Sequence, residues 1–213
     1  VLGLLWSRRS FRWMAVGAAF NAFAGYSSAN WTASFMIRSH GMTTGELGTW
    51  LALIMGVGGA IGVFFGGYLA DKLAVRDKRW YMWVTALTCL VPLPFVIPVY
   101  LVDSAYVALT LSIIPGILSN VYVANAIATT HAMVGLRMRA TASAILFFIL
   151  NMFGLGAGPW SVGLLSDLLA PNLGVESLRY AMLYLIPAAL ALSGACFLLA
   201  SRNLRQDMAA APD

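Results

Sequence analysis

Long apolar runs separated by short polar stretches dominate the chain. Six such runs lie at positions 12 to 37, 47 to 70, 81 to 101, 106 to 131, 141 to 167 and 178 to 201. As helices with a rise of about 1.5 Å per residue, they are long enough to cross a hydrocarbon core of about 30 Å. The runs lack the alternation of a membrane β-barrel. The pattern therefore predicts an all-α membrane protein with six transmembrane helices.

The second and fifth runs carry the same pattern of small residues. Gly58 to Ala74 and Gly154 to Ala170 align at an offset of 96 positions and share G-x-x-x-G-x-x-x-x-G-x-L-[A/S]-D-x-L-A. An odd number of predicted crossings separates the copies, so the sequence predicts two inverted three-helix repeats, about 12–101 and 106–201. We expect the following residues to allow close packing or bending of helices: Gly58, Gly62, Gly67, Gly154, Gly158, Pro159 and Gly163.

The basic residues predict the orientation of the chain. Eleven of the 13 Lys and Arg residues lie up to the start of the first run or after the second, fourth and sixth, whereas Arg38 and Arg179 lie at the other end of the predicted bundle. By the positive-inside rule, both termini are expected in the cytoplasm and the bundle in the plasma (inner) membrane. This divides the chain into a cytoplasmic segment 1–11, a six-helix bundle 12–201 and a cytoplasmic tail 202–213. Residues 208–213 are expected to be disordered.

The composition excludes an ordinary soluble domain. Hydrophobic residues make up 61% of the chain and charged residues 10%, against about 25% charged in soluble proteins. The net charge of +5 falls in short clusters between apolar runs, so we expect a lipid bilayer and no nucleic acid as partner. Cys89 and Cys196 lie inside apolar runs and are expected to be buried thiols. No zinc, nucleophile or phosphate-loop spacing is present, so we expect no cofactor and no enzyme activity.

Each repeat copy has an aspartate near its end. Each of these aspartates predicts a charged cluster at a membrane surface. The carboxylate of Asp71 is disfavoured at the C-terminus of its own helix and better placed near the start of a neighbouring helix. The predicted cytoplasmic gate consists of Asp71, Lys72, Arg76, Asp77, Arg79 and Arg139. The predicted outer gate consists of Asp167 with Arg38 or Arg179. Alternatively, the basic residues only fix the topology and bind anionic lipid head groups.

Polar residues inside the runs are candidates for a substrate cavity. Tyr122, Asn125 and Thr129 share one helix face, and a polar stripe on a bundle helix usually faces the interior. The cavity candidates are Asn21, Ser28, Asn30, Trp31, Tyr122, Asn125, Thr129 and Asn151. The alternative is that these side chains only form hydrogen bonds between helices.

The segment from Gly67 to Arg79, GYLADKLAVRDKR, resembles the signature loop of the major facilitator superfamily, with Ala74 where that family favours glycine. The run from Arg137 to Asp167 resembles the loop and eleventh helix of spinster-type members. RSHGM at 38–42 and SLRY at 177–180 are similar to that group as well.

This resemblance implies the carboxyl-terminal six-helix half of a twelve-helix secondary active transporter. Such a protein moves a small organic or amphiphilic, lipid-like solute by alternating access, with ion (proton) coupling. The opening at Val1 resembles a loop cut in its middle, so the amino-terminal six-helix half is an expected missing partner. Two alternatives remain open: a complete six-span protein that dimerises to form the transport path, and a non-transporting membrane-embedded subunit.

Overall fold

The computed structural model describes residues 1–210, and its first half consists of three helical rods joined by short loops. A short helix α1 (Leu2–Ser7) precedes the first rod. The rods are α2 (Arg9–His40), the series α3 (Thr44–Leu51), η1 (Ala52–Gly58) and α4 (Gly59–Ala74), and the pair α5 (Trp80–Leu90) and α6 (Leu93–Val99). Gly41, in the left-handed conformation at φ 67°, ends the first rod.

Three further rods form the second half. The fourth rod is interrupted, with α7 (Ala105–Leu111), α8 (Ile113–Leu118) and α9 (Val121–His131). The fifth contains η2 (Leu136–Met138), α10 (Arg139–Asn151), η3 (Met152–Ala157) and α11 (Gly158–Leu173). A turn at η4 (Gly174–Glu176) leads into α12 (Ser177–Ala209).

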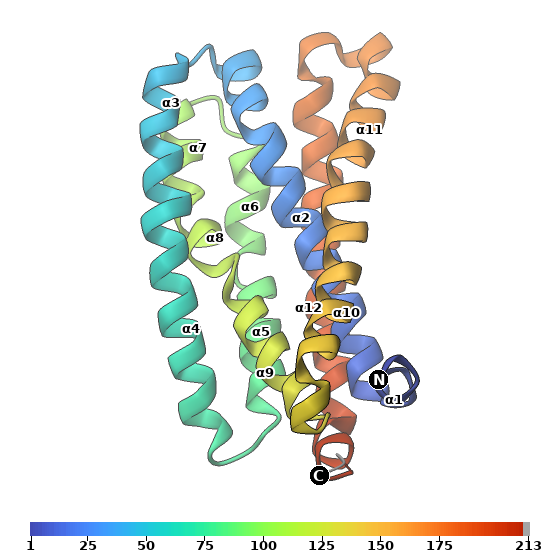
Figure 1. Ribbon diagram of the computed structural model, residues 1–213. Coiled ribbons are helices and arrows are strands. Elements are labelled where there is room, and N and C mark those ends of the chain that lie inside the picture. The colour runs from blue at the N-terminus through green and yellow to red at the C-terminus, as the bar shows by residue number, and fades with distance from the viewer. Residues whose placement is uncertain (211–213) are drawn as a thin grey trace.

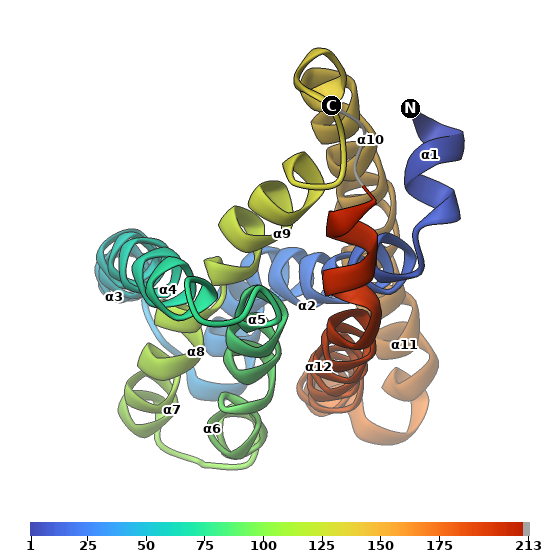
Figure 2. The ribbon, with the colours of Figure 1, turned by 90° about the horizontal axis from the view of Figure 1, so that it is seen from below.

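Four segments of residues 1–210 are long and apolar enough to cross a membrane. They are Thr44–Ala74, Trp80–Val99, Ala105–His131 and Leu136–Ala209. The last segment contains two rods, because the chain reverses at Gly174, where φ is 55°. The first rod, α2, is not among the four. It carries polar residues such as Asn21, Ser27 and Asn30 and crosses the middle of the bundle, as Figure 2 shows.

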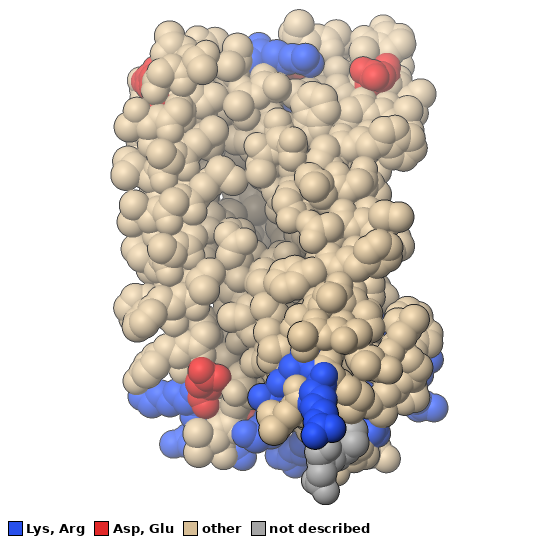
Figure 3. All heavy atoms as spheres, in the orientation of Figure 1, with Lys and Arg blue, Asp and Glu red and all other residues tan. Residues whose placement is uncertain are grey.

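The rods run side by side, and α1 and the end of α12 lie at the same end of the bundle (Figure 1). The space-filling view shows Lys and Arg side chains gathered at this end, which we call the terminal end (Figure 3). The loop after α4 lies there as well, whereas the turn after α11 lies at the opposite end. The ends of the two repeat copies therefore lie at opposite ends of the bundle.

Glycines in the first repeat copy allow the second rod to contact the fourth. A Cβ at Gly62 would lie 1.5 Å from the carbonyl oxygen of Ile117 in α8, and one at Gly58 would lie 3.3 Å from Cγ1 of the same residue. Gly66 likewise faces Val121 of α9 at 2.3 Å. Gly67, predicted for this role, has no atom within 4 Å of such a Cβ, so that prediction is wrong by one position. The shift arises because the packed face follows a four-residue spacing.

Glycines in the second copy bring the fifth rod against the first. A Cβ at Gly154 would lie 2.6 Å from Cβ of Ala22, and one at Gly158 would lie 2.9 Å from the carbonyl oxygen of Phe23. The indole of Trp31 lies 3.1 Å from a Cβ position at Gly163 and donates a hydrogen bond to the carbonyl of Pro159 at 2.9 Å. Each repeat-bearing rod thus packs on the first rod of the other half. Each also contains a π-helical stretch, η1 or η3, before its second α-helix.

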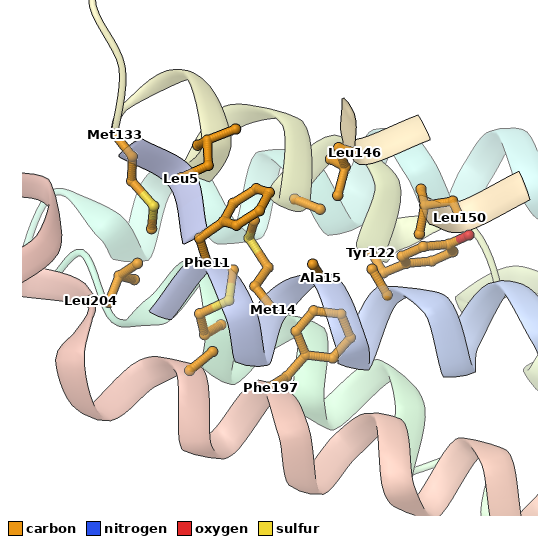
Figure 4. Packing of buried hydrophobic residues seen from close by; sticks show 14 of the residues in the cluster. Leu5, Phe11, Met14, Ala15, Tyr122, Met133, Leu146, Leu150, Phe197 and Leu204 are labelled. Atoms are coloured by element: carbon orange, nitrogen blue, oxygen red, sulfur yellow. The ribbon is translucent and has the colours of Figure 1, made fainter. Parts of the chain in front are cut away.

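Two apolar clusters fill the ends of the bundle. At the terminal end, Phe11 and Met14 of α2 pack with Phe197 of α12 and with side chains from α9 and α10 (Figure 4). The other cluster includes Phe35, Leu109 and Met182. In a bilayer, such tight contacts favour helix association mainly through van der Waals packing. Cys89 and Cys196 are free and buried.

The end of the chain differs from the prediction. Helix α12 continues to Ala209, so Met208 and Ala209, expected in a disordered tail, are helical. Asp207 stabilises this end because its Oδ2 accepts hydrogen bonds from the backbone N–H of Ser10 at 2.8 Å and from the Ser10 hydroxyl. The carboxylate thereby satisfies a donor in the first turn of α2. The rest of the predicted tail, 211–213, lies outside the described residues.

Candidate functional site

A cavity of about 350 Å³ lies between the rods, and the space-filling view shows a hollow at mid-height of the bundle (Figure 3). Rods one to five and α12 contribute to its wall. Four of the eight predicted cavity residues line this cavity, namely Asn21, Ser28, Tyr122 and Asn151.

The polar lining residues hold one another in place. The Tyr26 hydroxyl donates to Oδ1 of Asn151 at 3.1 Å and so joins α2 to α10. The Asn21 amide donates to the thiol sulfur of Cys89 in α5 at 3.0 Å. These bonds fix the side chains before any solute binds, which lowers the entropy lost on binding.

The other four predicted cavity residues lie elsewhere. Asn125 and Thr129 are buried, and Asn125 donates to Oγ1 of Thr85 at 3.0 Å, which makes it a bond between helices. Asn30 is exposed and donates to the carbonyl of Tyr26 at 2.8 Å, and Trp31 packs on α11. Along the polar face of α9, Tyr122 therefore lines the cavity, whereas Asn125 bonds to α5 and Thr129 is buried away from the cavity.

Several residues that line the cavity were not predicted as cavity candidates from the sequence. Aromatic side chains from two rods, Tyr26 and Tyr100, are among them. So are three residues around the interruption of the fourth rod, Ser112, Ser119 and Asn120. None of the lining residues is Asp, Glu, Lys, Arg or His. The lining is therefore neutral and mostly apolar, and suits the uncharged part of an organic molecule.

At the terminal end, the acids of the predicted cytoplasmic gate have separate partners. The Tyr81 hydroxyl, in the first turn of α5, donates to Oδ1 of Asp71 at 2.9 Å. Asp77 instead pairs with Arg205 of α12 through two contacts, at 2.6 and 2.8 Å, and accepts the backbone N–H of Arg79 at 3.0 Å. The loop after α4 is therefore tied to the last turns of α12.

The basic residues predicted for this gate do not all meet the acids. Lys72 lies over the ring of Tyr68, 5.8 Å from its centroid. Within residues 1–210, the side chains of Arg76, Arg79 and Arg139 form no ion pair. The sequence analysis missed Arg205, because the pairing depends on how far α12 extends beyond the apolar run.

The Asp77 pair predicts a pH dependence. The hydrogen bond from Arg205, helped by the Arg79 backbone N–H, lowers the pKa of the Asp77 carboxyl below its ordinary value of 3.8. The contribution of this pair to stability is therefore complete above pH 3.8 and is lost as the pH falls through the lower pKa of the folded state.

We expect Asp77→Asn to lower the melting temperature slightly at pH 7 and to reduce its decline towards pH 3, in thermal melts of purified protein. Arg205→Gln should change the melting temperature in the same way as Asp77→Asn. The double variant should be no less stable than either single variant. If the losses of the two single variants add up in the double variant, the ion pair is contradicted.

At the opposite end, the predicted outer gate does not form among residues 1–210. Nε of Arg179 lies 2.7 Å from Oε2 of Glu176, and its guanidinium lies 5.9 Å from the Phe35 ring centroid. Arg38 and Asp167 are exposed and form no ion pair in the described chain. The expected pairing of Asp167 with Arg38 or Arg179 is therefore not formed among residues 1–210, since Arg179 pairs with Glu176, which lies one helical turn before it.

Similarity to known proteins indicates the class of protein to which this fold belongs. No protein-family model matches the sequence. An MFS-type efflux pump from Mycolicibacterium smegmatis is 36% identical over 199 residues, which cover 93% of the chain and 46% of the pump. Protein spinster homolog 3 from Danio rerio is 28% identical, with 97% of the chain and 45% of that protein covered.

Solved structures agree with these relatives. A bacterial homologue of the human lysosomal transporter spinster superposes with a TM-score of 0.84 in an inward-facing, unoccupied conformation, at 25% identity. The inward-facing, occupied conformation gives a TM-score of 0.82 at 24% identity. These alignments cover 96% and 94% of the chain and 50% of each solved chain. The chain spans about half the length of the proteins it matches.

The apolar helical bundle and these relatives define an integral membrane protein with a transporter fold. The chain is homologous to an MFS-type efflux pump and to spinster homologues, and it corresponds in length to about half of such a protein. The resemblance predicted from the Gly67–Arg79 loop is therefore confirmed.

Proposed function

We propose that this chain is the carboxyl-terminal half of a secondary active transporter that moves a small organic or amphiphilic solute by alternating access. The observation that carries the proposal is the neutral cavity of about 350 Å³ between the rods, in a fold that transporters share. In this proposal an amino-terminal half closes the other side of the cavity and carries the site of ion (proton) coupling.

The six rods act as two inverted three-span repeats in this account. The reciprocal glycine contacts support it, because the second rod packs on the fourth as the fifth packs on the first. Exchange of the two repeats converts one contact into the other, as a pseudo-two-fold axis in the membrane plane requires.

The terminal end faces the cytoplasm in the proposal, across a plasma (inner) membrane. The gathering of Lys and Arg at this end supports the orientation. Asp71, Lys72, Arg76, Asp77, Arg79 and Arg139 then form part of an inner gate. Arg38, Asp167 and Arg179 remain candidates for an outer gate, completed by the amino-terminal half.

Reconstitution in liposomes tests the transport function. The full-length protein should accumulate a fluorescent amphiphile, such as ethidium or a fluorophore-labelled lysophospholipid, when a pH gradient is imposed. Protein-free liposomes and a gradient collapsed by an ionophore provide the controls. Failure to carry any amphiphile would contradict the proposal, and transport by the 213-residue chain alone would instead favour the dimer.

A further inference from the structure

The fourth rod is broken beside the cavity. Within the 27-residue segment Ala105–His131, α8 ends at Leu118 and α9 begins at Val121 (Figure 1). Pro115 has no N–H to bond the carbonyl of Leu111, which accounts for the earlier interruption at Ser112, between α7 and α8. The missing Cβ of Gly62 also lets the Ile117 backbone lie against α4. The break is thus built into the sequence near the middle of a segment long enough to cross the membrane.

This break leaves backbone donors without their helical partners. The Ser119 hydroxyl donates to the carbonyl of Gly116 at 2.9 Å, the acceptor that a continuous helix would offer to the N–H of Asn120. Helix α9, 11 residues long, then starts at the cavity wall, where its first N–H groups carry partial positive charge. Ser119, Asn120 and Tyr122 all line the cavity at this point.

Tyr122 provides an independent second observation. The residue is 7% exposed and lines the cavity, and its hydroxyl forms no hydrogen bond with any residue in the described range 1–210. In Figure 4 the ring lies beside Leu150 with the hydroxyl oxygen at the end away from Ala15. Because Tyr122 lines the cavity, this hydroxyl can donate a hydrogen bond to an acceptor group of a solute held there.

We propose that the start of α9 and the Tyr122 hydroxyl form a subsite for a hydrogen-bond-accepting, negatively charged oxygen group of the solute, such as a carboxylate. This inference rests on the proposed transport function and assigns a specific position within its cavity. The lining residues include no Lys, Arg or His, so the broken helix and the tyrosine are the places on this wall that favour an anion. The surrounding apolar wall accommodates the hydrocarbon part.

A protection experiment tests the subsite in the full-length protein in nanodiscs. Ser112→Cys places a thiol on the cavity wall, and its rate of alkylation by N-ethylmaleimide reports occupancy. The native Cys89 and Cys196 are buried, and the protein without Ser112→Cys gives their background. The probes are decanoate at pH 8 and decyltrimethylammonium, which have the same chain length but differ in their head group.

We expect decanoate to slow alkylation of the Ser112→Cys protein. Tyr122→Phe, which removes only the hydroxyl, should raise the half-protecting decanoate concentration about tenfold and leave that of decyltrimethylammonium unchanged. Tyr184→Phe, the same change at an exposed position on α12 away from the cavity, should alter neither value. Equal protection of wild type and Tyr122→Phe by decanoate would overturn the subsite but leave the cavity intact. An equal loss for both probes would also overturn it, as a packing effect. If neither probe slows alkylation, both the subsite and the proposed solute cavity are contradicted.

Discussion

Gly62→Ala is expected to prevent stable folding or to lower the melting temperature by at least about 5 °C. The added Cβ would lie 1.5 Å from the carbonyl oxygen and 2.6 Å from the carbonyl carbon of Ile117, and backbone atoms cannot rotate away as a side-chain end can. Overpacking costs about 1–3 kcal/mol, and a clash with backbone atoms lies at the upper end, so at about 2–4 °C per kcal/mol for a chain of this size the expected shift is about 6–12 °C. Size-exclusion chromatography and thermal melts in detergent measure the effect.

Gly67→Ala is the matched control on the same helix. No atom lies within 4 Å of its Cβ position, and alanine favours a helix over glycine by about 1 kcal/mol in exposed helix interiors. Its melting temperature should stay unchanged or rise. Equal destabilisation by the two substitutions would contradict the close contact between α4 and α8.

Asp71→Asn is expected to reduce transport by the full-length protein at least about tenfold without lowering its expression. Asp71 is exposed at the terminal end, and its only hydrogen bond within residues 1–210 comes from Tyr81. Asparagine can still accept that bond but lacks the charge that a partner on the amino-terminal half would use. Hydrogen bonds to charged groups contribute about 1.5–3 kcal/mol, and 1.4 kcal/mol corresponds to a tenfold change.

Initial rates of transport in the liposome experiment measure this effect, with the amphiphile that the wild type carries. Asp103→Asn is the control, since Asp103 is exposed in a loop at the opposite end and belongs to neither predicted gate. Unchanged transport by Asp71→Asn would remove this residue from the gate.

Each apolar run coincides with one rod, because backbone groups in lipid must be satisfied within helices, but hydropathy did not predict the interruptions of the fourth rod. The α2 helix nevertheless extends to Arg9 and α12 to Ala209, beyond the apolar residues that marked these runs. Polar contacts extend α12, above all the bond from Ser10 to Asp207. Hydropathy carries no information about such contacts.

The candidate site was only partly predictable. Periodicity predicted that Tyr122 and Asn125 share one face of α9. It did not predict the height along the helix at which this face stops lining the cavity and begins to pack against other helices. That height follows from the break at Ser119 and Asn120, which depends on Gly62 in another rod. Likewise, Asp77 pairs with Arg205, 128 positions away. Long-range contacts of this kind have no local sequence signal.

The inverted arrangement of the two repeats is the central claim, and cysteine labelling tests it most directly. Val75 follows α4 and is 86% exposed, and Val175 lies in the turn after α11 and is 69% exposed. Single cysteines at these positions are reacted in intact cells with a membrane-impermeant maleimide. The account predicts labelling of Val175→Cys from outside, and labelling of Val75→Cys only after the membrane is permeabilised. Labelling of both positions from the same side would contradict it.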